Sequence, residues 1–149
     1  MNASPGIELM AETGGKSLLE GEINSSIAAG HSVSLLSGSG IGVSPGNVTL
    51  EFEITREHPL VTLVSMIAPS PDWFVGVHGL NLLRGNQWVE DISVELMAYD
   101  AGTDDGTDYV SSDHDTQPRD PITAITGAPF LNNGSVRPVG TFRFTRINP

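Results

Sequence analysis

The chain has 149 residues with 38% hydrophobic residues, 17 Gly and 10 Pro, which is enough for one domain and is typical of an all-β fold with many turns. Its formal net charge of −11 excludes nucleic acid as a partner, because the phosphate backbone would repel the chain. No cysteine is present and no apolar run approaches the ~20 residues of a membrane-spanning helix, so we expect neither disulfides nor membrane insertion.

Two short helices are predicted near the N-terminus. Ser4 is an N-cap candidate followed by Pro5 at the first helical position, and Gly14-Gly15 ends the helix. A second, shorter helix is expected over about 17–22. It directs Leu18, Leu19 and Ile23 toward the core. The small, polar residues 25–46 follow as a connection, in which 31–36 is a candidate edge strand.

Alternating apolar residues predict the strands that follow. Residues 48–55 alternate with Thr and Glu, which indicates a half-buried strand with an acidic outer face. Residues 60–68 are apolar on both faces, as in a central strand. We read 79–87 as a loop. The remaining predicted strands are 73–77, 88–98, a short edge strand at 122–126, and 139–147 with Phe142 and Phe144 inward.

Acidic residues occur where two of these strands begin or end. Asp72 lies at a proline-stiffened corner directly before strand 73–77, whereas Asp100 and Asp104 follow strand 88–98. Side by side, two carboxylates ~4 Å apart would repel by about 4 kcal/mol at an effective dielectric near ~20, so three of them need protons or a cation. Oxygen ligands suit a hard cation, most simply Ca²⁺. Residues 100–120 contain seven Asp and one Arg, and this excess of negative charge also favours a bound counter-ion.

Other interpretations of the same residues stay open. Each Asp in the loop can simply cap its own turn. The loop is not an EF-hand, because Asp105 occupies the glycine position and Ser111 the final glutamate position. A solvated loop explains the run 113–115 better than a transition-metal site does, since its single His114 has no second histidine nearby in the sequence.

Two alternative functions use the same acidic end of the molecule. A metal-dependent hydrolase would need a pocket beside Asp72 and a base such as His114 reaching into it. A carbohydrate-binding module would need Trp73 or Trp88 flat on the surface, although we expect both to pack in the core near the acidic site. The serine-hydrolase and zinc-protease motifs are absent, and the four histidines are scattered.

Several runs together resemble the N-terminal spondin domain, which occurs in F-spondin, in mindin and in bacterial proteins. The similar runs are 11–14, 64–77, Trp88, 99–106 and 117–122. The resemblance implies an antiparallel β-sandwich similar to a C2 domain, in secreted proteins that act in adhesion and recognition. It also implies a calcium ion at one end, with Asp72, Asp100 and Asp104 as ligands and the carbonyl of Ala101 as a further one.

The chain departs from the family pattern in two respects. Animal members tend to have a cysteine where this chain has Leu83, which favours a bacterial member. Members also extend upstream with strands that this chain lacks, so an open sheet edge is expected to pair with another copy. We therefore predict one secreted, non-enzymatic domain over 1–149 that binds Ca²⁺ and an extracellular protein or glycan.

Overall fold

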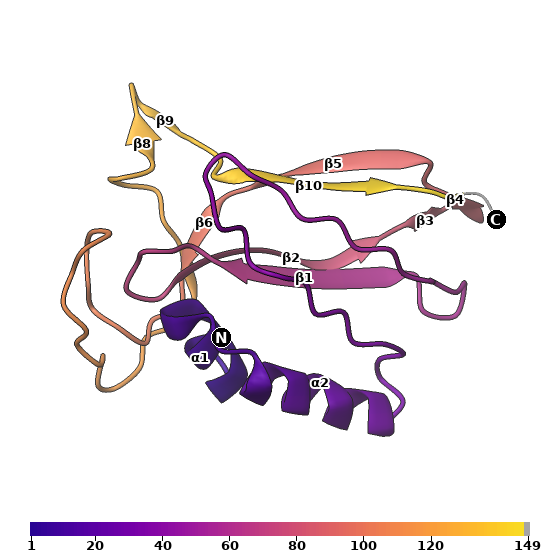
Figure 1. The fold of residues 1–149 in the computed structure, drawn as a ribbon, viewed down its shortest axis with the longest axis horizontal. Coiled ribbons are helices and arrows are strands. Elements are labelled where there is room, and N and C mark those ends of the chain that lie inside the picture. The colour runs from indigo at the N-terminus through magenta and orange to yellow at the C-terminus, as the bar shows by residue number, and fades with distance from the viewer. Residues whose placement is uncertain (148–149) are drawn as a thin grey trace.

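The computed structural model describes residues 1–147, which fold as an antiparallel β-sandwich with two helices at the N-terminus, as predicted (Figure 1). One sheet has the strand order β1-β2-β6-β7, and the facing sheet pairs β10 with β5. Two hairpins, β3-β4 and β8-β9, extend from the sandwich. The strands are β1 (Leu60–Met66), β2 (Trp73–Asn81), β3 (Leu83–Arg84), β4 (Gln87–Trp88), β5 (Asp91–Leu96), β6 (Ala98–Asp100), β7 (Thr123–Ala124), β8 (Leu131–Asn132), β9 (Ser135–Val136) and β10 (Gly140–Thr145).

The first helix has the ends that the sequence predicts. Helix α1 (Pro5–Thr13) begins after Ser4, whose Oγ accepts a hydrogen bond from the Ile7 N–H at 3.2 Å, and it ends at Gly14 in a left-handed conformation with φ 73°. Helix α2 (Ser17–Ala28) is longer than the predicted 17–22. The prediction that Leu18 points to the core is wrong, because 49% of its surface is exposed.

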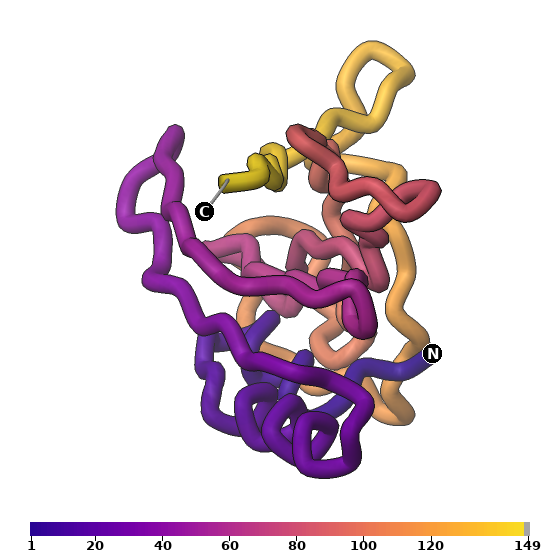
Figure 2. The backbone as a smooth tube through the Cα atoms, turned by 90° about the vertical axis from the view of Figure 1, so that its right-hand side faces the viewer, coloured from indigo at the N-terminus to yellow at the C-terminus, as the bar shows by residue number. Residues whose placement is uncertain are grey.

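Residues 48–55, predicted as a half-buried strand, form no strand in the structure. The alternation of burial is present only over 51–54, where Phe52 and Ile54 are half-buried and Glu51 and Glu53 are exposed; Val48 and Leu50, predicted to face inward, are exposed. A ladder also requires the edge of a neighbouring strand, and this extended segment pairs with none. The candidate edge strand at 31–36 is likewise irregular, and Figure 2 shows the whole segment as the purple tube along one side of the molecule.

Strand β1 lies at the edge of its sheet, so the prediction of a central strand is wrong. The central position belongs to β2, which pairs with β1 on one side and β6 on the other. One apolar face of β1 carries Val64 and Met66, which pack against the core cluster that contains Met10 and Ala11 of α1. A covering helix therefore produces the same pattern as a position inside a sheet.

The predicted strand 88–98 is divided between the two sheets. Strand β5 pairs with β10, and after Met97 the chain continues as β6 beside β2. The predicted loop 79–87 contains the end of β2 and most of the β3-β4 hairpin, which turns at Gly85 and Asn86 with φ 53° and 67°. The expected strands at 122–126 and 139–147 are confirmed as β7 and β10.

The buried core is concentrated at one end of the sandwich. One cluster joins Ala3, Met10 and Ala11 to Phe74 and Ala101, and a second joins Trp73, Ala98 and Phe130. Both clusters draw on β2 and on β6 or the residue that follows it. The ends of these two strands are therefore the most firmly packed part of the molecule, and they hold the acidic residues described next.

Candidate metal centre

Asp72 lies fully buried at the corner where the chain enters β2. Ser70 fixes this corner, because its Oγ accepts the Trp73 N–H at 3.1 Å. One carboxylate oxygen of Asp72, Oδ2, accepts hydrogen bonds from the Thr103 N–H at 2.8 Å, the Asp104 N–H at 3.2 Å and the Thr103 hydroxyl at 3.3 Å. The other oxygen, Oδ1, is buried without a hydrogen-bond partner. A buried, unpaired carboxylate oxygen is costly unless a proton or a cation accompanies it.

Asp100 reaches the same corner from the neighbouring strand. It is the last residue of β6 and lies opposite Trp73 of β2, so Asp72 is one residue away along the partner strand. Its Oδ1 accepts the Gly102 N–H at 2.8 Å, and the carbonyl of the fully buried Ala101 accepts no hydrogen bond within residues 1–147. The corner therefore offers both a carboxylate and a main-chain oxygen, which are the two ligand types that calcium prefers.

Asp104 is held in the turn that follows. Its Oδ1 accepts the Gly106 N–H at 2.8 Å and its Oδ2 accepts the His114 N–H at 2.8 Å. Asp100 and Asp104 thus do cap their own turns, as the simpler interpretation of the loop predicted. Capping leaves lone pairs on these oxygens, since each carboxylate oxygen can accept two bonds.

Glycine at two positions lets this loop close against the corner. Gly102 has φ +74°, and a Cβ on it would lie 2.3 Å from the Asp120 carbonyl oxygen. A Cβ on Gly106 would lie 2.4 Å from Cγ of Pro71. Neither position has room for a side chain, so both bring the loop backbone into direct contact with its neighbours.

Glu12 of α1 is a further acid at this site, and the sequence analysis missed it as a functional residue. Its Oε1 is buried without a hydrogen-bond partner. Burial raises the pKa of Glu12, the nearby Thr103 hydroxyl lowers it in part, and the charges of Glu8, Asp113 and Asp72 raise it further. The available signal was its place in the run 11–14, directly after two residues that face the core.

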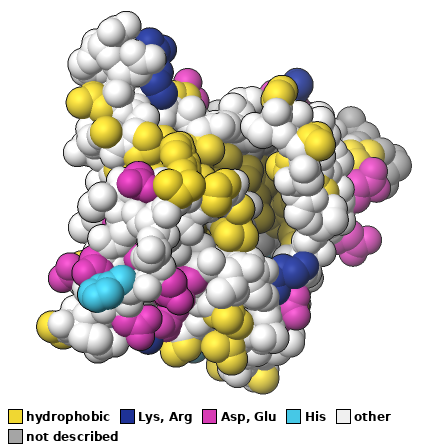
Figure 3. Space-filling model, turned by 60° about the vertical axis from the view of Figure 1, so that its left-hand side comes forward, with side chains coloured by type: hydrophobic (Ala, Val, Ile, Leu, Met, Phe, Trp, Pro, Cys, Tyr) yellow, Lys and Arg dark blue, Asp and Glu magenta, His cyan; other side chains and the backbone are white. Residues whose placement is uncertain are grey.

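The electrostatics of the corner disfavour the negative charge of Asp100. Burial raises the pKa of Asp100, the Asp72 carboxylate raises it further, the Gly102 N–H lowers it, and Asp120 and Asp104 add smaller increases. Figure 3 shows acidic side chains gathered around a histidine on the face that the 100–120 loop forms. A cation at this corner would offset the repulsion among these carboxylates.

The carboxylates are near one another without forming a complete ligand shell. Within residues 1–147, no group of three or more His, Cys, Asp or Glu side chains is placed to hold one ion. The chemistry of the available oxygens still suits calcium, because Asp72 Oδ1 and Glu12 Oε1 have no hydrogen-bond partner among the described residues and carboxylate and main-chain oxygens are the ligand types that calcium prefers. Main-chain oxygens or small side-chain rotations would have to complete the shell.

Neither alternative function gains support at the acidic end. The His114 side chain is exposed and its Nδ1 lies 3.0 Å from Asp105, an ion pair that raises the pKa of His114. The cavity that His114 lines does not include Asp72. Trp73 is only 2% exposed and packs against Tyr109 and Phe130 at 5.3 and 5.4 Å, so it offers no face to a sugar.

The prediction that Trp88 lies near the acidic site is wrong. Trp88 ends β4 in the hairpin that lies at the other end of the molecule from the 100–120 loop (Figure 1). It is half-buried there instead of joining either core cluster.

Comparison with known proteins gives the family. The Spondin_N family profile matches residues 1–135. The chain belongs to the spondin N-terminal domain family. It is 37% identical to human spondin-2 over 145 residues, which are 97% of this chain and 42% of that protein. It is 31% identical to chicken spondin-1 over 157 aligned positions, which are 97% of this chain and 20% of that protein.

This spondin domain thus spans less than half the length of these relatives. The spondins are secreted proteins of the extracellular matrix, in keeping with a role in adhesion or recognition. Neither helix of the described residues has the length and apolarity to cross a membrane.

Proposed function

We propose that this spondin domain is a secreted recognition or adhesion module whose acidic end binds Ca²⁺. The observation that carries the proposal is Asp72, a fully buried carboxylate with one oxygen unpaired. The side chains of Asp100, Asp104 and Glu12 and the carbonyl of Ala101 would complete the set of ligands. When bound, the ion supplies positive charge that offsets the crowded carboxylates; it supplies no reaction chemistry.

The chain's own residues explain why such a site would act on the shape of the loop end. The Asp72 carboxylate already joins the corner before β2 to the backbone of Thr103 and Asp104. Restraining Asp72, Asp100 and Asp104 together would fix the 100–120 loop against both strands. A fixed loop presents one surface to a partner, which lowers the entropic cost of recognition.

Thermal melting in EGTA, in Ca²⁺ and in Mg²⁺ tests the calcium site. At a hundredfold excess over Kd, bound ligand adds about 2.7 kcal/mol, which corresponds to a rise in Tm of about 5–10 °C for a chain of this size. We expect this rise with Ca²⁺ and its loss in Asp100→Asn, a variant that keeps an acceptor for the Gly102 N–H. Asp108→Asn removes the same charge from an exposed part of the loop and should retain the rise.

Absence of any calcium-specific shift, together with no metal in the purified protein, would overturn the calcium proposal and leave the fold and family intact. A Ca²⁺ response that survives in Asp100→Asn but disappears in Asp108→Asn would place the ion elsewhere in the loop.

The partner, the extent of the domain and the source of the chain stay predictions. We propose that the partner is an extracellular protein or glycan, and that the open edge of β1 also permits pairing with a second copy. The single domain over 1–149 and the bacterial origin inferred from Leu83 rest on the sequence alone.

A further inference from the structure

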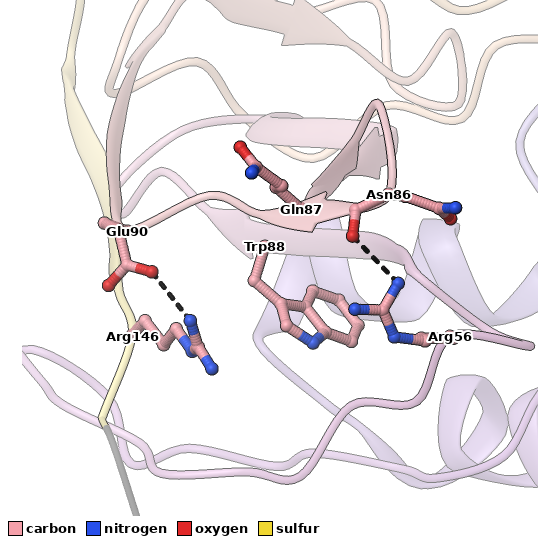
Figure 4. A pocket seen from close by; sticks show the side chains of 6 residues that line it. All are labelled: Arg56, Asn86, Gln87, Trp88, Glu90 and Arg146. Atoms are coloured by element: carbon pink, nitrogen blue, oxygen red, sulfur yellow. Dashed lines mark hydrogen bonds and ion pairs between the residues drawn. The ribbon is translucent and has the colours of Figure 1, made fainter.

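A cavity of about 390 Å³ lies at the end of the molecule opposite the acidic loop (Figure 4). Its walls come from the segment before β1, the β3-β4 hairpin, the residue before β5 and the residue after β10. The lining residues are Arg56, Asn86, Gln87, Trp88, Glu90 and Arg146. This volume is within the range of small-molecule sites, which run from about 300 to 1,000 Å³.

Arg56 brings a positive charge to this cavity. Its guanidinium carbon lies 5.9 Å from the centre of the Trp88 ring, and its Nη1 donates to the Asn86 carbonyl at 2.9 Å. It forms no ion pair with a carboxylate of residues 1–147. One carbonyl occupies one of the five N–H groups of a guanidinium, so most of its donors are available to a ligand.

The second guanidinium of the cavity is held by an acid. Arg146 Nη1 lies 2.7 Å from Glu90 Oε1, and both side chains are substantially exposed. Among the described residues that line the cavity, two arginines stand against one glutamate, in a protein whose net charge is −11. Figure 4 shows the Trp88 indole between the two guanidinium groups, so an aromatic face and cationic donors border the same space.

We propose that this cavity binds an acidic sugar, a hexuronate unit of an extracellular polysaccharide. A guanidinium fork matches a carboxylate in bidentate geometry, and an indole face accepts the C–H face of a pyranose ring. The strong negative charge of the rest of the domain works against long-range attraction, so binding depends on these short-range contacts. The proposal rests on the recognition role proposed above and does not require the cation.

The test is a titration of the ¹⁵N-labelled full chain with methyl β-D-glucuronide, and with methyl β-D-glucoside, which differs in lacking the carboxylate. The two tryptophans give separate indole N–H signals, assigned with Trp88→Phe. We expect saturable shifts of the Trp88 signal with the glucuronide and none of the buried Trp73 signal. The glucoside and sodium acetate should bind at least about tenfold more weakly, since each lacks one of the two recognition elements.

Variants locate the contact. Arg56→Gln should raise the Kd for the glucuronide at least about tenfold, and Arg56→Lys, which keeps the charge but not the fork, should weaken binding as well. The matched control is Arg137→Gln, which removes an exposed arginine from the residue after β9. Melting curves establish that each variant is folded.

No shift of the Trp88 signal, equal binding of the glucoside, or unchanged affinity in both Arg56 variants would overturn the proposal. An equal response to acetate would reduce the site to one for a simple anion and would also overturn it. The titration is run in EGTA and in Ca²⁺, so that glucuronide binding without any calcium effect on melting refutes only the calcium site. A calcium-dependent Tm with no glucuronide binding refutes only this cavity's proposed ligand.

Discussion

Replacing Gly102 by alanine tests whether the acidic loop is held as tightly as its geometry indicates. Gly102 has φ +74°, and a Cβ there would meet the Asp120 carbonyl oxygen at 2.3 Å, whereas real Cβ atoms essentially never approach closer than 3.0 Å. The left-handed backbone costs an alanine about 1–2 kcal/mol. Moving the Asp120 backbone away also strains the hydrogen bond from its N–H to the Gly102 carbonyl, 2.9 Å long, which is worth about 1 kcal/mol.

Gly134 provides a matched control that isolates the cost of placing alanine in a left-handed backbone conformation. It has φ +78°, and a Cβ on it would have no atom within 4 Å. We expect Gly134→Ala to cost about 1–2 kcal/mol and Gly102→Ala at least about 2–3 kcal/mol, measured as the free energy of unfolding in urea. That loss is a large part of the roughly 5–15 kcal/mol that stabilises a domain. Equal losses in the two variants would refute the close contact between Gly102 and Asp120.

Two further predictions concern the ends and edges of the sheets. Hydrogen bonds from Thr145 and Arg143 hold the pKa of Asp91 below its usual range, so its stabilising effect is complete above about pH 4 and is lost as pH falls through the lowered folded-state pKa. Asp91→Asn should therefore lower the urea midpoint at pH 7 and leave it unchanged at pH 2; an equal drop at both values would contradict this. The open edge of β1 should pair copies of the domain, so light scattering should detect dimers that Leu60→Lys weakens and Leu131→Lys does not. A monomer at every concentration would argue against that edge as an interface.

The sequence was sufficient where chemistry is local. A serine before a proline and a pair of glycines define both ends of α1, and acids at adjacent strand ends predicted that Asp72 and Asp100 would meet. Alternation was insufficient at 48–55, because it cannot report whether a neighbouring strand edge exists, and without one Val48 and Leu50 remain exposed. Trp88 was placed wrongly because it belongs to the β3-β4 hairpin, most of which lies within the stretch 79–87 that was predicted to be a loop. This hairpin is at the other end of the molecule from the acidic site.

Glu12 illustrates a different limit. Its role depends on where α1 docks, and a short helix in the sequence gives no indication of the sheet end that it covers. The helix packs through Met10 and Ala11 against Phe74 and Ala101, and this contact brings the next residue to the acidic corner. The sequence analysis gave this helix only a packing role, but the same packing places the Glu12 carboxylate at the acidic corner.

The position of the core gives the acidic corner influence over the whole domain. Phe74 and Ala101 belong to one buried cluster and Trp73 and Ala98 to the other, and these residues flank Asp72 and Asp100 in the chain. Repulsion among the carboxylates therefore acts on the best-packed strands, while a charge at exposed Asp108 acts only on a loop. For that reason a cation at this corner should raise the stability of the entire fold. The measurement is amide hydrogen exchange in β2 and β6, which should become slower when Ca²⁺ is added. If protection increased only in the 100–120 loop, the corner would be uncoupled from the core, in conflict with this packing.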